Sequence, residues 1–324
     1  MKAIVIINPV SGTKPPDIIK KELINKLDNL SYEYEVKETE KPAHAYIIAK
    51  EAVDNNINLV IVVGGDGTIN EVVNAIACTD VCLGIIPNGT GNLLATSLGI
   101  PMDFSKSINI IFENNRKKID LGRINNQYFS IIAGCGFDAT IMKNVKRSDK
   151  KILGFLAYFI EGFKQALFPR RSIFNLLIDG KRVKKRALTV LFINSGNILG
   201  NIITIVPDAS MTDGLLDVCI FSPQHTGEFI PVLWKILTKE NTQKDPDFDR
   251  ITHLKAKEIK FKCRPRLPVQ ADGDVIGYPP LDIHAVPDAL NVIVPKKIST
   301  FVMNPEEFFK SLMEEAFNLS ENKS

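Results

Sequence analysis

Cysteine is scarce in this chain, and its scarcity excludes one large class of small secreted proteins. The five cysteines among 324 residues form no Cys-x-x-Cys pair and show no spacing typical of a metal site. A secreted scaffold held together by disulfides would be much denser in cysteine. We therefore expect reduced thiols and a cytoplasmic location.

Long hydrophobic runs are also missing. The longest apolar block covers only residues 152–160, whereas a membrane-spanning helix needs about 20 apolar residues. The apolar run at 3–7 ends at Asn8 and Pro9 rather than at a small-residue cleavage site, so we expect a first β-strand there and no signal peptide. The chain contains no repeats and no low-complexity tracts.

The charge of the chain is unevenly distributed. The formal net charge is +3, but residues 143–186 hold 13 Lys or Arg and 3 Asp or Glu, so that this segment alone carries +10. Such asymmetry predicts one basic face, whose natural partner is an anionic surface.

The hydrophobic pattern changes near residue 119 and indicates two domains. The first part alternates apolar strands at 3–7, 59–63 and 83–86 with helical segments at 16–27, 44–55, 69–77, 92–98 and 105–113. This alternation is typical of an α/β domain with a parallel sheet. The later part has short strands between turn signals, which predicts an antiparallel β-sandwich.

The expected boundaries follow from this change. The first domain should span residues 1–120, with a C-terminal helix at 300–324 packing back on it. The second domain should span 121–299 and contain an inserted helix at 148–168, ended by Pro169.

Three glycine-containing turns follow the three predicted strands, at residues 8–12, 64–68 and 87–92. In a parallel sheet these turns share the carboxyl edge, so we expect them to converge. Glycine lets the backbone approach a ligand, and free N–H groups at the next helix favour phosphate. Strand-to-helix turns also use glycine without any ligand, and Thr68 with Glu71 fits a capping box. Asp66 would repel phosphate unless Mg²⁺ or a bound donor lies between them, so the sequence predicts a metal.

Neither of the standard nucleotide fingerprints is present, because the chain has no GxxxxGK[ST] and residues 65–70 lack the third glycine of GxGxxG. The stretches "VVGGDGTINEVVNAI" (62–76) and "GIIPNGTGNLLATSLGIP" (84–101) instead resemble the catalytic domain of the diacylglycerol kinase family, which includes sphingosine, ceramide and bacterial soluble lipid kinases. This resemblance implies an ATP-dependent lipid kinase that is also dependent on Mg²⁺, with diacylglycerol as the expected acceptor.

The family's motifs map onto this sequence residue by residue. In the family, ATP is contacted by the early Asn-Pro-x-Ser-Gly motif, the threonine before "PAHA", the Gly-Gly-Asp-Gly-Thr motif and the "NGTGN" loop. The "PAHA" segment departs from the family pattern, because Ala43 stands where the family has glycine. The implied ATP-binding residues are Asn8, Pro9, Ser11, Gly12, Thr39, Gly64, Gly65, Asp66, Gly67, Thr68, Asn70, Glu71, Gly89 and Thr90.

Two later Asp-Gly sites also resemble functional positions of the family. Residues 206–218 are similar to its structural magnesium loop, which implies metal ligands at the Asp213 carboxylate and the carbonyls of Ser210 and Leu215. Residues 269–277 are similar to the motif that contains the catalytic base. We expect Asp274 to be the base while Asp272 orders magnesium-bound water, and the exchanged roles and a simple hairpin turn are the alternatives.

The expected partners are ATP, a diacylglycerol-like lipid and the inner face of a membrane, bound peripherally. An apolar stripe along 148–168 and the basic stretch at 181–186 suggest docking on anionic lipid, although the stripe could equally cover the sandwich core. No nucleic-acid motif is found, so no nucleic acid is expected. The oligomeric state is open, and a homodimer is one alternative.

Three other functions are compatible with these motifs: a kinase for a sphingosine-like or ceramide-like lipid, an NAD kinase-like enzyme, and a non-catalytic lipid-binding protein regulated by nucleotide. The NAD kinase family shares the Gly-Gly-Asp-Gly signature. The Asn-Pro-x-Ser-Gly start and the "NGTGN" loop favour the lipid kinase, and the acidic residues at 272 and 274 argue against loss of catalysis.

Overall fold

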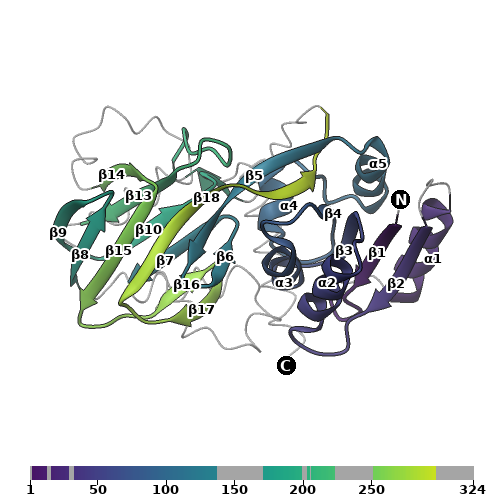
Figure 1. Cartoon of the computed structure of the whole chain (residues 1–324), viewed down its shortest axis with the longest axis horizontal. Helices are drawn as coiled ribbons and strands as arrows, with labels where there is room; N and C mark the ends of the chain where they lie inside the picture. The colour runs from purple at the N-terminus through teal and green to yellow at the C-terminus, as the bar shows by residue number, and fades with distance from the viewer. Residues whose placement is uncertain are drawn as a thin grey trace, which may run out of the picture. The chain divides into compact units, whose positions relative to one another are not determined.

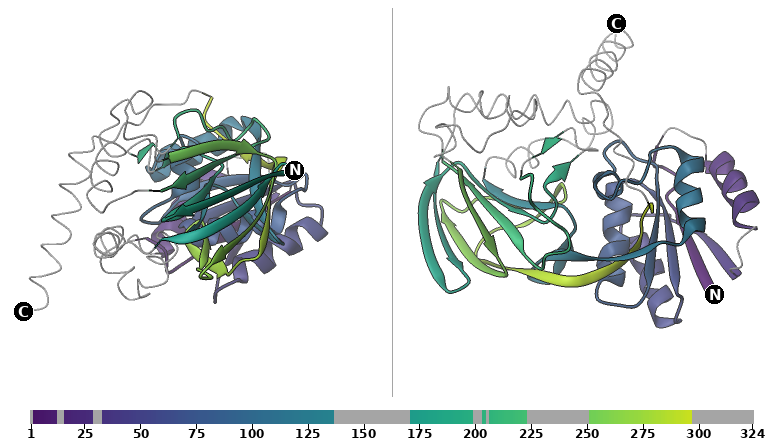
Figure 2. Two further views of the ribbon diagram at one scale, coloured as in Figure 1. Left: turned by 90° about the vertical axis from the view of Figure 1, so that its left-hand side faces the viewer. Right: turned by 90° about the horizontal axis from the view of Figure 1, so that it is seen from above.

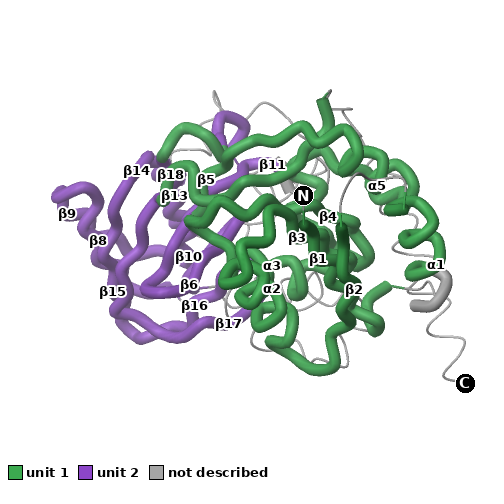
Figure 3. Tube along the Cα trace, turned by 45° about the vertical axis from the view of Figure 1, so that its right-hand side comes forward, with its two compact units in different colours: residues 1–121, 211–214, 286–301 green, residues 122–210, 215–285, 302–324 purple. Residues whose placement is uncertain are grey.

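The computed structural model describes residues 2–12, 16–28, 33–136, 171–198, 203–204, 206–222 and 251–296. The chain divides into two compact units, shown in Figure 3: unit 1 comprises Met1–Leu121, Met211–Gly214 and Val286–Phe301, and unit 2 comprises Gly122–Ser210, Leu215–Ala285 and Val302–Ser324. The helices expected at 148–168 and 300–324 lie outside the described residues. No helix in the described part of the chain is long and apolar enough to cross a membrane.

Unit 1 is built on a parallel sheet with the order β2-β1-β3-β4 (Figure 1). Its strands are β1 (Lys2–Ile7), β2 (Glu33–Glu38), β3 (Leu59–Gly64) and β4 (Cys82–Pro87). Every residue of β3 and β4 is buried, as expected for strands whose side chains are apolar on both faces. The prediction of an α/β unit with a parallel sheet is confirmed.

In the part of the chain that the structure describes, five helices connect or follow these strands, and Figure 2 shows helices on both faces of the sheet. They are α1 (Pro16–Leu27), α2 (His44–Asp54), α3 (Asp66–Ile76), α4 (Leu93–Ser97) and α5 (Phe104–Glu113). In α3 the buried residues Ile69, Val72, Val73 and Ile76 recur at helical spacing, which explains why this segment packs as an amphipathic helix. It begins at Asp66, three residues before the expected start.

The described part of unit 2 consists of antiparallel strands in two layers. One layer is a sheet with the order β14-β13-β10-β7-β16-β17, and in the other β15 pairs with β8 and with the first part of β18, while β8 pairs with β9. The strands are β7 (Ile132–Gly136), β8 (Ser172–Ile178), β9 (Lys181–Ala187), β10 (Thr189–Ile193), β13 (Leu216–Phe221), β14 (Ile251–Ala256), β15 (Glu258–Arg264), β16 (Val269–Ala271), β17 (Asp274–Gly277) and β18 (Leu281–Ile293).

The remaining short strands complete the connections. β5 (Arg116–Ile124) pairs with β6 (Gln127–Phe129), and β11 (Asn197–Ile198) pairs with β12 (Ile203–Thr204). The last part of β18, at Asn291 and Val292, runs parallel to β4 within unit 1.

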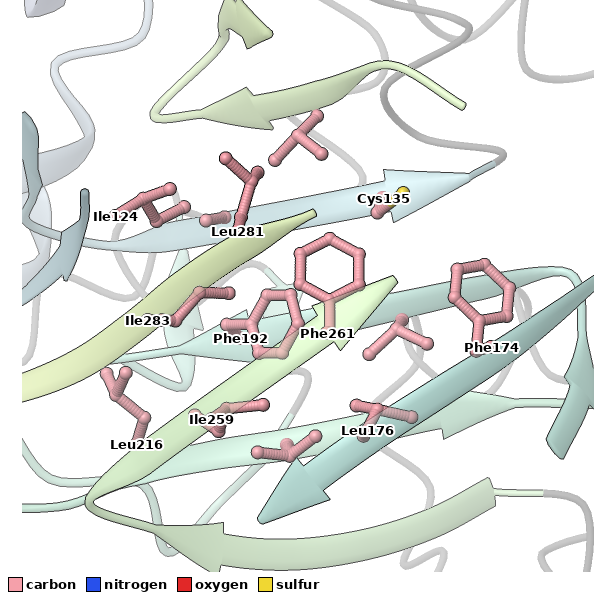
Figure 4. Packing of buried hydrophobic residues seen from close by; sticks show 14 of the residues in the cluster. Ile124, Cys135, Phe174, Leu176, Phe192, Leu216, Ile259, Phe261, Leu281 and Ile283 are labelled. Atoms are coloured by element: carbon pink, nitrogen blue, oxygen red, sulfur yellow. The ribbon is translucent and has the colours of Figure 1, made fainter. Parts of the chain in front are cut away.

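The core of unit 2 lies between the two layers, as Figure 4 shows. Phe192 of β10 and Phe261 of β15 face each other with ring centroids 5.3 Å apart, and Phe174 of β8 is fully buried. Burying a side chain of this size contributes roughly 1.5–3 kcal/mol relative to leaving it in water. The expected antiparallel sandwich is confirmed.

Candidate active site

The three glycine-containing turns of unit 1 are joined by side-chain hydrogen bonds. Asn8 Nδ2, after β1, donates to Thr68 Oγ1 in the first turn of α3 at 2.7 Å. Asn88 Nδ2, after β4, donates to the backbone carbonyl of Ser11 at 2.8 Å. The backbone N–H of Asn88 also donates to the carbonyl of Gly64 at 2.9 Å. The predicted convergence of these turns at one edge of the sheet is therefore confirmed.

Close contacts between the turns explain most of the glycines in them. A Cβ atom added to Gly89 would lie 2.6 Å from the Cα of Gly65, and one added to Gly12 would lie 2.3 Å from Asn88 Oδ1. Gly12 also has a φ of 72°, a conformation that favours glycine. These residues are glycine because the turns pack against each other without room for a side chain.

Gly67 differs from the other turn glycines, because beyond its chain neighbours and its own helix backbone no atom of a described residue lies within 4 Å of a Cβ added to it. It is exposed in the first turn of α3, where no side chain caps the helix N-terminus. The capping box that the spacing of Thr68 and Glu71 fits, which was the alternative to a ligand site, is therefore not formed. Packing within the protein does not require glycine at this position, and the open space beside it can admit a ligand close to the backbone.

Asp66 joins the second turn to the third. Its Oδ2 accepts a hydrogen bond from the backbone N–H of Asn92 at 2.8 Å, and its Oδ1 accepts one from Leu93 N at 2.5 Å. These N–H groups lie at the start of α4, where a carboxylate is favourable. The donors that Asp66 needs are thus backbone groups, and Asp66 alone no longer provides evidence for a metal.

Glu71 stabilises the start of α2, whereas a capping box with Thr68 would have stabilised the start of its own helix, α3. Its two carboxylate oxygens accept hydrogen bonds from the backbone N–H groups of Ala43, at 2.8 Å, and Ala45, at 3.1 Å, at the start of α2. The carboxylate therefore stabilises the N-terminus of α2 and connects α2 to α3.

The other expected ATP-binding residues are accessible to different degrees. Thr90 is exposed, and Pro9, Ser11, Thr39 and Asn70 are partly buried. The backbone N–H of Thr39 donates to the carbonyl of Ile7 at 2.9 Å, which places Thr39 beside the end of β1.

The two aspartates of the β16–β17 hairpin in unit 2 have very different surroundings. Asp272 and Gly273 have φ values of 45° and 90°, as expected for an Asp-Gly hairpin turn. The Asp272 carboxylate accepts hydrogen bonds from Ser130 N at 2.6 Å and Ser130 Oγ at 2.9 Å. It also accepts from the N–H groups of Ile131 and Ile132, both at 3.0 Å.

These contacts fix the Asp272 carboxylate and leave Asp274 accessible. Burial raises the pKa of Asp272, and the hydrogen bonds to its carboxylate oppose that rise. Asp274 is exposed, and none of its side-chain atoms forms a hydrogen bond or ion pair with a described residue. Asp274 is thus the carboxylate of this pair that an external group can reach.

The turn that contains Asp213 is held by an aspartate that sequence reasoning missed. Asp120, on β5, is only 2% exposed. It accepts hydrogen bonds from Gly214 N at 2.7 Å and Asp288 N at 2.9 Å, and its own N–H donates to the carbonyl of Met211 at 2.7 Å. The only signal in the sequence is one acidic residue within the apolar part of a strand.

The residues around Asp213 supply oxygen donors. Asp213 is exposed, and Ser210 and Leu215 are partly buried. No group of three or more His, Cys, Asp or Glu side chains able to hold a metal occurs among the described residues. A single carboxylate with backbone carbonyls is an all-oxygen donor set, which suits Mg²⁺ and leaves places for water.

Comparison with protein families gives two matches that together span most of the chain. The diacylglycerol kinase catalytic domain matches residues 2–124, and the YegS C-terminal NAD kinase beta sandwich-like domain matches residues 131–294. A diacylglycerol kinase of Bacillus subtilis (strain 168) is 32% identical over 302 residues, covering 91% of this chain and 97% of the relative. One of Staphylococcus aureus (strain Newman) is 31% identical over 322 residues, covering 97% and 99%.

Solved structures show the same fold. A putative diacylglycerol kinase from Bacillus anthracis str. Sterne superposes with a TM-score of 0.78 at 24% identity, covering 91% of this chain and 97% of the neighbour.

Proposed function

The chain belongs to the diacylglycerol kinase family and is a lipid kinase, and on that premise we propose that it transfers the γ-phosphate of ATP to the hydroxyl group of diacylglycerol, which yields phosphatidic acid. The observation that carries this proposal is the set of three turns joined by Asn8, Asp66 and Asn88 beside the open space at Gly67.

Phosphoryl transfer depends mainly on positioning and on neutralising charge. The bond between the acceptor oxygen and the γ-phosphorus forms while the bond from that phosphorus to the bridging oxygen breaks, and ADP leaves. We propose that the phosphates lie against the backbone of the three turns, with Gly67 admitting the closest approach and with Ser11, Thr68 and Thr90 supplying hydroxyl groups.

The remaining residues of the nucleotide site have supporting roles. Gly12, Gly64, Gly65 and Gly89 shape the backbone of the turns, and Thr39 and Asn70 border them. Asn8, Asp66 and Glu71 act as positioning residues, because their side chains are hydrogen-bonded to Thr68, to the start of α4 and to the start of α2, respectively. Pro9 restricts the first turn through its fixed φ.

Magnesium is proposed as the second cofactor. When bound, it neutralises charge on the phosphates and orders water. We assign the structural magnesium site to the Asp213 carboxylate and the carbonyls of Ser210 and Leu215. Asp120 positions this loop, since it bonds to Gly214 N and to the N–H of Asp288.

Asp274 is proposed as the general base, and Asp272 as the residue that positions the hairpin. Asp274 is exposed and its carboxylate has no partner among the described residues, so it is able to take the proton of the acceptor hydroxyl. The Asp272 carboxylate already accepts four hydrogen bonds. This leaves it little capacity to order magnesium-bound water.

Because its substrate resides in a membrane, we also propose that the enzyme works on the inner face of the membrane as a peripheral protein. The lipid acceptor and the membrane location belong to one hypothesis. Its first test is which acceptor the enzyme phosphorylates.

Radiolabelled ATP offered with diacylglycerol, sphingosine and NAD in parallel reactions tests the function. We expect label in phosphatidic acid and little in the other products, with the Asp274→Asn variant as the inactive control. Labelled NADP would overturn the lipid acceptor, and labelled sphingosine phosphate alone would redirect the proposal to another lipid. ATP binding without any labelled product would favour a non-catalytic role.

A further inference from the structure

The outer face of strands β15, β8 and β9 in unit 2 is an array of cations. Successive side chains of a strand point to opposite faces. The residues Phe174 and Leu176 of β8 and Ile259 and Phe261 of β15 point into the core (Figure 4). The residues between them along each strand therefore point to the other face, which we call the cationic face. It consists of Lys260, Lys262 and Arg264 from β15, Ile173, Asn175 and Leu177 from β8, and Arg182, Lys184 and Arg186 from β9.

The strand register aligns these nine residues in three rows. Figure 1 shows β15, β8 and β9 side by side, and the paired residues form the rows Arg264–Ile173–Arg186, Lys262–Asn175–Lys184 and Lys260–Leu177–Arg182. The rows are about 7 Å apart, and the two cationic columns are about 10 Å apart across β8. Six positive charges thus lie within about one to two Debye lengths of one another at physiological salt.

Neighbouring acids offset only part of the charge of this face. None of its six cations forms a salt bridge with any residue in the described part of the chain. The acidic residues nearest in register are Asp282, which pairs with Lys260 across the β15–β18 ladder, and Glu258 at the end of β15. All six cations are exposed.

Protection of a sheet edge does not explain this arrangement. Charged residues on an edge strand prevent unwanted pairing with another chain, and β9 is an edge strand. However, β15 lies inside the sheet between β18 and β8, where its backbone is already paired on both sides. The three cations of β15 therefore need another explanation.

We propose that the cationic face docks on anionic phospholipid headgroups and so holds the enzyme on the membrane. This proposal rests on the lipid kinase function proposed above and identifies the surface that contacts the bilayer. Ile173 is 41% exposed between the cationic columns, and apolar side chains among cations are typical of interfacial binding. The face carries no aromatic side chain on which a base could stack, so a single-stranded nucleic acid fits it less well.

Vesicle co-sedimentation without ATP tests the surface directly. The protein is mixed with phosphatidylcholine vesicles or with equimolar phosphatidylcholine and phosphatidylglycerol vesicles. We expect binding to the anionic vesicles only, with the binding decreasing as salt increases. The test variant is the double substitution Lys184→Gln with Lys262→Gln, which removes the two cations of the central row.

A matched control is available on the same strand. Lys181 and Lys185 alternate with the cations of the face and pair with Ile178 and Phe174 of the core side. The double substitution Lys181→Gln with Lys185→Gln removes the same charge from the other side of β9. Each cation at the surface contributes about a fivefold change in partitioning, so we expect about a 25-fold loss for the test variant and a clearly smaller loss for the control.

Kinase activity on diacylglycerol in detergent micelles separates this proposal from the proposed function. The Lys184 and Lys262 variant should retain wild-type activity there and lose it on anionic vesicles. Equal losses of vesicle binding in the two variants would overturn the proposal, as would equal binding of the wild type to neutral and anionic vesicles. Binding to duplex DNA that disappears in the test variant, with vesicle binding unchanged, would assign the face to nucleic acid. Thermal melts of both variants establish that they are folded.

Discussion

Ser130 donates two hydrogen bonds to the Asp272 carboxylate, one from its backbone N–H at 2.6 Å and one from its hydroxyl at 2.9 Å. Together with Ile131 N and Ile132 N, these donors attach the β16–β17 hairpin to the segment that leads into β7. Asp274, two residues later, lies exposed. The two aspartates, which look equivalent in the sequence, therefore predict different mutant phenotypes.

Replacing Asp272 by Asn should destabilise the protein. Asparagine keeps one acceptor oxygen and has an NH₂ group in place of the other. That NH₂ group would face a backbone N–H donor that has lost its acceptor. Leaving a buried donor unpaired costs about 1–3 kcal/mol, and we expect a loss of that size in urea denaturation. Asp274→Asn is the matched control, because the same chemical change on the exposed carboxylate should leave the midpoint unchanged. Equal midpoints for both variants would contradict the positioning role of Asp272.

Asp274→Asn should instead remove activity from a folded enzyme. General-base assistance typically contributes about 10² to 10⁴ in rate, so kcat should fall by that factor. The dissociation constant for ATP, measured by calorimetry, should stay the same because the side chain acts on the acceptor hydroxyl. Wild-type turnover in this variant would transfer the role of base to another residue.

Gly67→Ala should separate stability from nucleotide binding. Outside its own helix backbone the added methyl group meets no atom of a described residue within 4 Å, and alanine favours a helix over glycine by up to about 1 kcal/mol. We therefore expect an unchanged or slightly higher melting temperature together with weaker ATP binding. Gly89→Ala is the comparison, because its Cβ would lie 2.6 Å from the Cα of Gly65 and should lower both stability and binding. ATP affinity equal to wild type in Gly67→Ala would show that no ligand approaches this residue.

Sequence patterns predicted the buried and strongly periodic elements well. The expected segments at 16–27, 44–55 and 92–98 correspond to α1, α2 and α4 to within one residue at each end. Strand β2 was missed, because "EYEVKE" is half exposed and has few apolar residues. Periodicity reports burial, so an element at the margin of a sheet gives little signal.

Contacts between distant segments were not predictable from local patterns. The spacing of Thr68 and Glu71 fits a capping box, but Glu71 bonds to Ala43 and Ala45, which precede it by 28 and 26 residues. Asp120 likewise bonds to Gly214 and Asp288 far along the chain. Motif spacing points to the polar residues that belong to a site. The hydrogen-bond partner of each carboxylate depends on how distant segments pack together.

Asp66 provides a test of whether its carboxylate serves the backbone or a metal. Each of its oxygens accepts one backbone N–H, from Asn92 and Leu93. In Asp66→Asn one of these donors would face an NH₂ group, so we expect a loss of about 1–3 kcal/mol in stability and weaker ATP binding as α4 shifts away from the turns.

The dependence of activity on magnesium distinguishes the two roles of Asp66. If the carboxylate holds α4, the magnesium concentration for half-maximal activity should be the same in Asp66→Asn as in the wild type, although kcat/KM for ATP falls. A removed metal ligand would instead raise that magnesium concentration while the melting temperature stayed unchanged. Asp103→Asn supplies the control for the loss of a helix-capping carboxylate, because Asp103 accepts from Lys106 N at 2.8 Å at the start of α5. It should affect stability modestly and leave both kinetic quantities as they are in the wild type.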